Sequence, residues 1–181
     1  MHCTRRTALL APLAAVLSTP AAHAAEPARF QAPNLVEISP TLVTCGQPNA
    51  AALKTLAAHG FAADIYLAPL TVYDAVRDEP EIVRGHGLEF VHIPIAFNEP
   101  DEADFARFTE AMATLRERKV LVHCQVNMRA SSMVFLYRAI KLKEPPDAAY
   151  KAVAQVWSPQ GPWKNLIEAQ LKKNGIAFEP Y

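Results

Sequence analysis

A cysteine and an arginine that lie close together in the sequence are the residues best placed to do chemistry. They begin and end a segment whose residues, with the preceding histidine, are His123-Cys124-Gln125-Val126-Asn127-Met128-Arg129. Residues 120–122 are apolar and mostly β-branched, as in a central parallel strand, and an apolar helix is predicted after Arg129. Backbone N–H groups and the helix dipole converge at such a loop, which suits an oxyanion. The same field favours the thiolate of Cys124, and the planar guanidinium of Arg129 can bind two oxygens of a phosphate-like group.

A single cysteine at the end of a strand is more commonly a small buried hydrophobe than a nucleophile. The combination of strand, His-Cys pair, closing arginine and apolar helix is much more specific, and it favours the functional interpretation. His123 is expected to orient the loop through a hydrogen bond rather than to transfer protons.

The elements around this loop alternate between strand and helix. Strands are predicted within 35–43, 61–67, 89–95 and 120–122, and helices within 49–58, 78–84, 101–115, 130–142, 146–156 and 162–173. This order predicts an α/β fold, a three-layer sandwich with a mostly parallel central sheet of about four strands. In such folds ligands bind outside the carboxyl ends of the strands, which is where residues 124–129 fall.

The amino-terminal 24 residues have the pattern of a cleaved secretion signal. Arg5 and Arg6 precede an apolar run at 8–17, and a small-residue stretch ends at Ala24. Because that run is well short of the roughly 20 residues of a spanning helix, we expect no membrane span. The expected location is periplasmic or secreted, by the general or the twin-arginine route. Residues 25–33 are predicted to be a linker, and 34–181 a single domain.

Composition excludes several other classes. Removal of residues 1–24 subtracts two arginines and no acid, so that 18 − 2 = 16 basic residues face 18 acidic ones, a net charge of −2 with histidine neutral. Nothing in that balance suggests a nucleic-acid partner. His59, His86 and His92 lack carboxylate or cysteine partners at ligand spacing, so no metal is expected. The remaining cysteines, Cys45 and Cys124, could form one disulfide that blocks the nucleophile.

The loop and its surroundings resemble a known group of enzymes. The stretch VLVHCQVNMRASSMVFLYR resembles the signature of the protein tyrosine phosphatase superfamily, nearest its dual-specificity branch. GQPNAAALKTLAAHGF and GLEFVHIPI are similar to a bacterial phosphatase-like family that includes members labelled β-lactamase hydrolase-like. Together these segments cover roughly residues 35–160. The resemblance implies a cysteine-phosphatase fold, a phosphocysteine intermediate at Cys124, and no metal or organic cofactor.

The resemblance also implies further site residues. Substrate phosphate would be held by the loop and its flanking residues, namely Gln125, Val126, Asn127, Met128, Arg129 and Ser131. An acid after the strand at 89–95 would protonate the leaving oxygen. Asp101 is the first candidate, ahead of Glu99 and Asp104, although capping of the following helix explains Asp101 equally well.

The loop departs from the superfamily pattern in three ways. Four residues separate Cys124 from Arg129, where the superfamily has five, and rhodaneses use four to hold a persulfide. The mid-loop glycine is missing, but Asn127 can supply a positive φ. Ala130 stands where a Ser or Thr assists departure of the thiolate, leaving Ser131 or Ser132 as substitutes.

Three functions stay open on this basis. The first is a phosphatase of phosphomonoesters, with tyrosine phosphate in proteins among its candidate substrates. The second is a rhodanese-like sulfurtransferase or persulfide carrier, and the third is an inactive oxyanion-binding module. The oligomeric state is not indicated.

Two other segments have open roles. Cys45-Gly46-Gln47-Pro48 either approaches the loop or is a plain strand-to-helix turn. The segment 157–163 either holds helices against the core or faces substrate.

Overall fold

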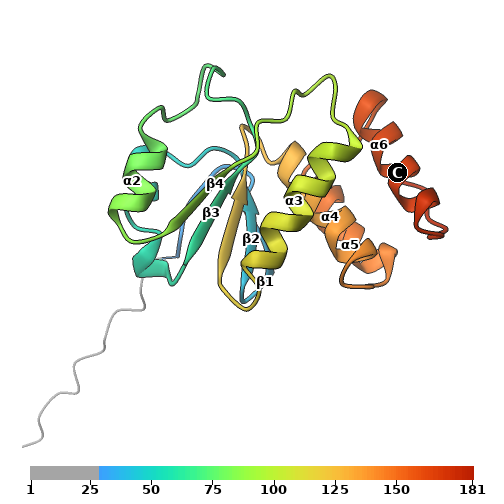
Figure 1. Ribbon diagram of the computed structural model, residues 1–181, viewed down its shortest axis with the longest axis horizontal. Helices are drawn as coiled ribbons and strands as arrows, with labels where there is room; N and C mark the ends of the chain where they lie inside the picture. Colours follow the sequence, from blue (N-terminus) through green and yellow to red (C-terminus); the bar gives the residue numbers. More distant parts are fainter. Residues whose placement is uncertain (1–28) are drawn as a thin grey trace, which may run out of the picture.

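The computed structural model describes residues 29–181, which form an α/β sandwich (Figure 1). The expected secretion signal at 1–24 lies outside the described residues. Within residues 29–181, no helix is both long and apolar enough to cross a membrane. The end of the expected linker packs on the domain, because the ring of Phe30 contacts that of Phe61 edge to face at 5.4 Å.

The central sheet has five strands in the order β1-β2-β5-β3-β4. β1 is antiparallel to β2, and the other neighbours are parallel, which confirms the mostly parallel sheet. The extra strand arises because the extended stretch at 35–43 folds into a hairpin around a turn at Pro40 and Thr41. The strands are β1 (Val36–Ser39), β2 (Leu42–Cys45), β3 (Ala63–Tyr66), β4 (Glu89–His92) and β5 (Val120–His123).

Helices cover both faces of this sheet, as the predicted three layers require. On one side α1 packs against α2, and on the other α4 packs against β2, β5, α5 and α6 (Figure 1). The helices are α1 (Ala50–Leu53), a 3-10 turn (Ala57–His59), α2 (Glu79–Gly85), α3 (Glu102–Thr114), α4 (Met128–Ile140), α5 (Pro146–Ala154) and α6 (Gly161–Lys173).

Local sequence signals set the ends of these elements. The Asn49 side chain caps α1 by accepting from the Ala52 N–H at 2.9 Å, as predicted. Gly60 stops the next turn in the left-handed conformation, with φ 78°. The predicted helix at 49–58 is divided into α1 and the 3-10 turn by a turn at 54–56, and Gly60 then directs the chain toward β3.

β5 and α4 carry the site loop at the centre of the molecule. All four residues of β5 are buried between β2 and β3, which explains its continuous apolar run. In α4 every residue except Met128 and Arg138 is buried. The loop between them is therefore held by two elements that are packed on all sides.

Candidate functional site

The site loop joins the carboxyl end of β5 to the amino terminus of α4. Cys124 follows the last residue of β5, and Asn127 is the N-cap residue of α4 with φ 71°, the left-handed conformation predicted for it. Its side-chain Nδ2 donates to the Asn34 carbonyl oxygen at 2.7 Å and to Thr44 Oγ1 at 3.1 Å. Asparagine thus supplies both the backbone turn and two contacts that anchor the loop.

The turn after β2 lies directly against this loop. Gly46 forms an isolated β-bridge with Val126, and the Gln47 N–H donates to the Gln125 carbonyl oxygen at 2.9 Å. A Cβ on Gly46 would lie only 2.8 Å from that same oxygen. The turn therefore belongs to the wall of the site, and glycine is required there by close backbone approach.

Both cysteines of the described chain are free and buried. The Cys124 N–H donates to the Cys45 carbonyl oxygen at 3.3 Å, so the two residues are neighbours across β2 and β5. Burial raises the pKa of the Cys45 thiol, and the charges of Asp64, Cys124 and Glu79 raise it further. Cys45 is accordingly held as a neutral thiol beneath the loop.

Arg129 is a buried arginine without an acidic partner among residues 29–181. Its side chain is 4% exposed, Nε donates to the Ile95 carbonyl oxygen at 3.0 Å, and Nη1 lies 3.5 Å from Gln125 Oε1. The guanidinium carbon is 5.0 Å from the centre of the Phe97 ring. None of the ion pairs among residues 29–181 involves Arg129. Its charge is therefore available to an anion.

The other predicted loop residues differ in their exposure. Val126 is 38% exposed, whereas Gln125 and Met128 are half-buried. The hydroxyls of Ser131 and Ser132 donate to the Met128 carbonyl oxygen at 3.2 and 2.9 Å. Both serines thus lie inside the first turn of α4 with their hydroxyls already hydrogen-bonded.

Asp101 is the N-cap residue of α3. Its carboxylate accepts from the Asp104 N–H at 2.8 Å, and Asp104 accepts from the Asp101 N–H at 3.1 Å, which forms a capping box. Asp104 also pairs with Arg107. No hydrogen bond in residues 29–181 joins Asp101, Asp104 or Glu99 to residues 124–129.

A different acid contacts the loop. Asp74, in the segment between β3 and α2, accepts from Gln125 Nε2 at 2.9 Å through Oδ1. Sequence analysis missed this residue because the segment has no periodicity and no motif. The only available signal was that β3 adjoins β5, which brings the segment after β3 to the same edge of the sheet.

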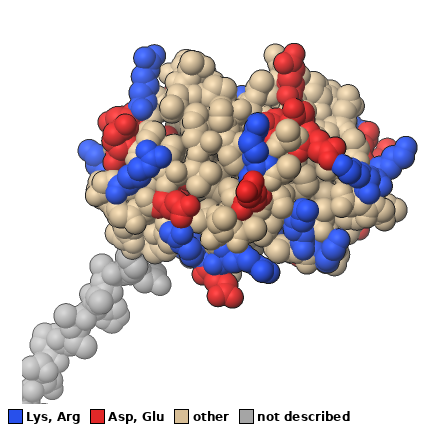
Figure 2. Space-filling model, viewed as in Figure 1, with Lys and Arg blue, Asp and Glu red and all other residues tan. Residues whose placement is uncertain are grey.

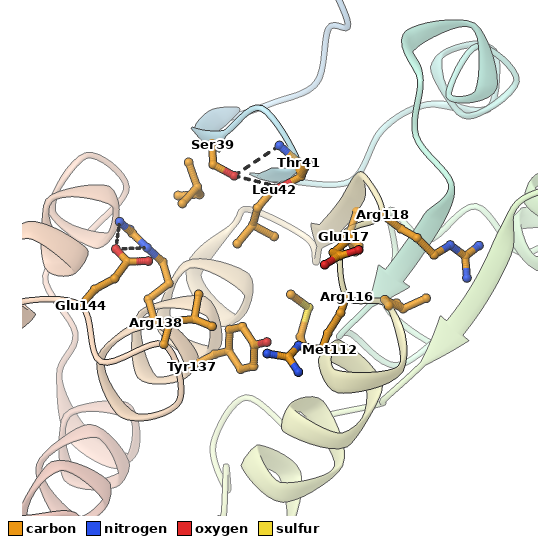
Figure 3. A pocket seen from close by; sticks show the side chains of 14 residues that line it. Ser39, Thr41, Leu42, Met112, Arg116, Glu117, Arg118, Tyr137, Arg138 and Glu144 are labelled. Atoms are coloured by element: carbon orange, nitrogen blue, oxygen red, sulfur yellow. Dashed lines mark hydrogen bonds and ion pairs between the residues drawn. The ribbon is translucent and has the colours of Figure 1, made fainter.

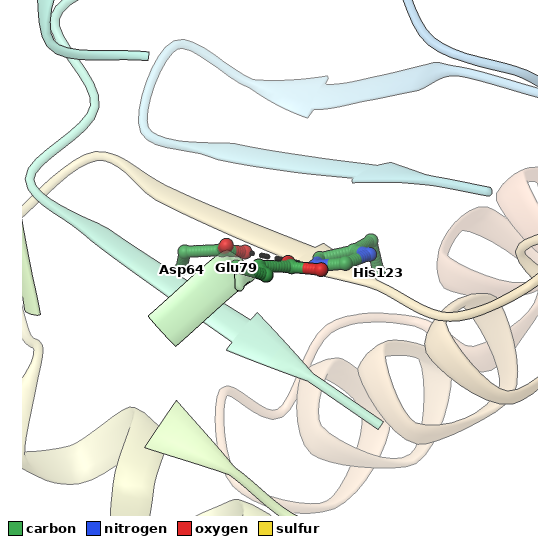
Figure 4. A group of neighbouring side chains, drawn as sticks. All are labelled: Asp64, Glu79 and His123. Carbon is green, nitrogen blue, oxygen red and sulfur yellow. Dashed lines mark ion pairs between the residues drawn. The ribbon is translucent and has the colours of Figure 1, made fainter. Parts of the chain in front are cut away.

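A buried cluster that sequence analysis also missed lies under the loop (Figure 4). His123 Nε2 is 2.6 Å from Glu79 Oε1 and 3.2 Å from Asp64 Oδ1, and all three side chains are 0% exposed. Glu79 also accepts from Gln47 Nε2 at 2.7 Å. Two ligands of one tetrahedral zinc ion would lie about 3.4 Å apart. The shorter nitrogen–oxygen contact suits an ion pair better than a metal site.

The charges in this cluster depend on one another. Burial lowers the pKa of His123, but Asp64 and Glu79 raise it by more, to about 10. Burial raises the pKa of Asp64 to about 6 against the opposing effect of His123. Burial acts to raise the pKa of Glu79, but the charge of His123 and the hydrogen bonds with His123, Gln47 and Asp64 together outweigh it, and the net shift is downward. His123 is thus an imidazolium that joins β5 to β3 and α2, in line with a structural role.

An aromatic row extends from this cluster across the sheet. The Tyr66 ring stacks on His123 at 4.7 Å and on His92 at 5.4 Å, since the three residues are in register on adjacent strands. The Tyr66 hydroxyl is buried and has no hydrogen-bond partner among residues 29–181. Burial first, and then the charges of Glu79 and Asp74, raise the pKa of this hydroxyl.

The tryptophans at 157 and 163 support one wall of the site. Trp163 Nε1 donates to the Phe97 carbonyl oxygen at 2.8 Å, and the Phe97 ring lies 6.0 Å from each indole. Phe97 is 37% exposed and lies beside Arg129. The tryptophans therefore hold the segment after β4 in place. They contact Phe97, which in turn contacts Arg129 of the site.

Elsewhere the surface offers a separate cavity of about 430 Å³ (Figure 3). Leu42 and Val120, the first residues of β2 and β5, line it, whereas the site loop follows the last residue of β5. None of the predicted site residues lies in its wall.

Acidic and basic side chains are interspersed over the face of the molecule in Figure 2.

Comparison with known proteins gives structural matches. No family model matches the sequence, and neither does any curated protein. A candidate phosphatase (DUF442) from Shewanella putrefaciens CN-32 is similar, with TM-score 0.73 and 28% identity over 80% of this chain and 92% of that one.

More distant structures share the fold. Kinase associated phosphatase is 17% identical, with TM-score 0.63, over 76% of this chain and 89% of its own. The core catalytic domain of the PP-IP phosphatase SIW14 from S. cerevisiae is 11% identical, with TM-score 0.63, over 81% of this chain and 96% of its own. The fold thus agrees with that of known phosphatases.

Proposed function

We propose that this chain, which has the fold of protein tyrosine phosphatase-like proteins, is a phosphatase of that superfamily and hydrolyses phosphomonoesters with Cys124 as the nucleophile. The observation that carries the proposal is the buried guanidinium of Arg129. It has no acidic partner in the part of the chain that the structure describes, and it closes a loop that begins with the cysteine. An arginine in that state favours a bound anion, because an uncompensated buried charge is unfavourable.

The proposed reaction has two steps. The loop N–H groups and Arg129 hold the phosphoryl oxygens while the Cys124 thiolate attacks phosphorus. The bond from phosphorus to the leaving oxygen breaks, and phosphocysteine forms. Water then attacks phosphorus, the sulfur–phosphorus bond breaks, and inorganic phosphate leaves as the thiolate returns.

Turnover of an aryl phosphate by the reduced protein tests this proposal. Cys124→Ser should abolish turnover, because the hydroxyl is a far weaker nucleophile at neutral pH. Arg129→Lys keeps the charge but loses the planar fork, so kcat/KM should fall by about 10²-fold. Full activity in Cys124→Ser would rule out the mechanism.

A second candidate function is sulfur transfer. The four-residue spacing between Cys124 and Arg129 favours it, since rhodaneses use the same spacing. Incubation with thiosulfate followed by intact mass measurement should then show one added sulfur that Cys124→Ser lacks. Anion binding without phosphate turnover or added sulfur would indicate an inactive oxyanion-binding module.

Export remains a proposal that rests on residues 1–24. Protein recovered from the periplasm of an expressing bacterium should begin near Ala25, which amino-terminal sequencing would detect. Replacement of Arg5 and Arg6 by Lys should block only a twin-arginine route.

A further inference from the structure

We propose that Asp74 is the general acid of this site, the residue that protonates the leaving oxygen. The inference rests on the proposed phosphatase function. It differs from the sequence-based expectation, which placed this role on the segment after β4, first of all at Asp101.

The sheet brings the segment that carries Asp74 to the reaction centre. β3 pairs with β5, Tyr66 is in register with His123, and the Leu67 N–H donates to the His123 carbonyl oxygen at 2.8 Å. The chain therefore leaves β3 beside Cys124. In Figure 1 the segment between β3 and α2 rises from the same end of the sheet as the loop between β5 and α4.

Asp74 contacts the loop residue next to the nucleophile. Its Oδ1 accepts from Gln125 Nε2 at 2.9 Å, and the Gln125 Oε1 lies 3.5 Å from Arg129 Nη1. One amide side chain therefore spans the carboxylate and the guanidinium that would hold the phosphoryl group. Asp74 is half-buried, and its Oδ2 takes no hydrogen bond from residues 29–181. That oxygen is free to face a leaving group.

Four other carboxylates of the region are committed elsewhere. Asp101 and Asp104 hold the capping box of α3, and Asp104 also pairs with Arg107. Asp64 and Glu79 are fully buried against His123. Among the acids of residues 29–181, only Asp74 makes a hydrogen bond to the segment 124–129.

The proton balance of the two steps is complete with Asp74 alone. As thiolate attack breaks the bond from phosphorus to the leaving oxygen, the protonated Asp74 carboxyl gives its proton to that oxygen. The products are phosphocysteine, a neutral alcohol and the Asp74 carboxylate. The carboxylate then takes a proton from the attacking water, which restores the acid.

Two substrates that differ in leaving group separate this role from a structural one. Phenyl phosphate releases a phenolate whose conjugate acid has a pKa of about 10, so its departure requires protonation. 2,4-Dinitrophenyl phosphate releases a stable anion that needs none. Asp74→Asn keeps an oxygen that can accept from Gln125 but has no proton to give. It should lower kcat/KM for phenyl phosphate by about 10²-fold or more, and for the dinitrophenyl ester by less than about tenfold.

Asp78→Asn is the matched control, because Asp78 lies in the same segment, is exposed and has no side-chain cap contact. It should leave both rates unchanged. Equal losses on both esters in Asp74→Asn, or no loss on either, would overturn the inference. So would the selective loss appearing in Asp101→Asn, which retains an N-cap acceptor. Wild-type protein that hydrolyses neither ester would instead refute the phosphatase function, and the acid role with it.

Discussion

The backbone at Gly46 approaches the backbone of Gln125 so closely that a Cβ on Gly46 would lie 2.8 Å from the Gln125 carbonyl oxygen. The same oxygen accepts the Gln47 N–H at 2.9 Å, and Gly46 bridges to Val126. The turn after β2 therefore supports the site loop from below. This support helps to explain how a loop with four residues between Cys124 and Arg129 keeps a defined shape.

Gly46→Ala is expected to displace the site loop. Because the clash is with backbone, relief requires the turn and the loop to separate, which should lower the free energy of unfolding by about 1–3 kcal/mol. Activity and phosphate affinity should fall with it. Urea unfolding and turnover measure the two effects. Gly85→Ala is the control, since a Cβ at Gly85 meets nothing within 4 Å and its φ is not positive. If Gly46→Ala is as stable as this control, the close approach of the two backbones is not required.

Asn127 has a positive φ that distinguishes two substitutions. Asn127→Gly and Asn127→Ala both lose the hydrogen bonds to Asn34 and Thr44, but only alanine adds left-handed strain. Asn127→Ala should therefore be less stable than Asn127→Gly by about 1 kcal/mol, measured by urea unfolding. The opposite order would mean that the left-handed turn does not persist in solution.

The buried cluster predicts how stability changes with pH. The pKa of His123 rises from 6.5 to about 10 on folding, so its contribution is complete below pH 6.5 and is lost as the pH rises toward 10. The pKa of Glu79 is lowered from 4.5, so its contribution is present above that value and is lost as the pH falls below it. The pKa of Asp64 rises from 3.8 to about 6, so its ionised form destabilises the fold above pH 6. The free energy of unfolding, measured from about pH 5 to pH 10, should therefore decline as the pH rises from 6.5 toward 10.

Glu79→Gln removes one partner of His123 and tests the origin of that decline. It leaves His123 with Asp64 alone, so the pKa of His123 should rise less on folding, and the alkaline loss of stability should be smaller and complete at a lower pH than in the wild type. At neutral pH the variant should be less stable by about 3–5 kcal/mol, as is usual when one member of a buried pair is removed. Identical pH profiles for the two proteins would show that His123 is not held charged by Glu79.

Cys45 and Cys124 are expected to remain free thiols. Because burial raises the pKa of Cys45, this thiol should resist alkylation in the folded protein and react only after unfolding. Alkylation without reductant, followed by peptide mapping, should recover both cysteines unlinked. A peptide linked through Cys45 and Cys124 would instead support the redox block considered from the sequence.

Local patterns account for the parts of the fold that were predicted. The apolar run of β5, the Asn49 cap and the Gly60 stop each depend on neighbours within a few residues, so the sequence alone reveals them. The division of 35–43 into β1 and β2 was missed, because its alternation does not show where a strand reverses.

The sequence by itself determined the strand, loop and helix that hold Cys124 and Arg129, and also the left-handed turn at Asn127, since all of these rest on residue types at short spacing. Only the tertiary structure decided which distant groups meet that loop. Asp74, Gly46 and the Asp64–Glu79–His123 cluster are brought there by the strand order β2-β5-β3 and by α2. Such contacts depend on pairing between strands far apart in the chain, and no local spacing encodes them.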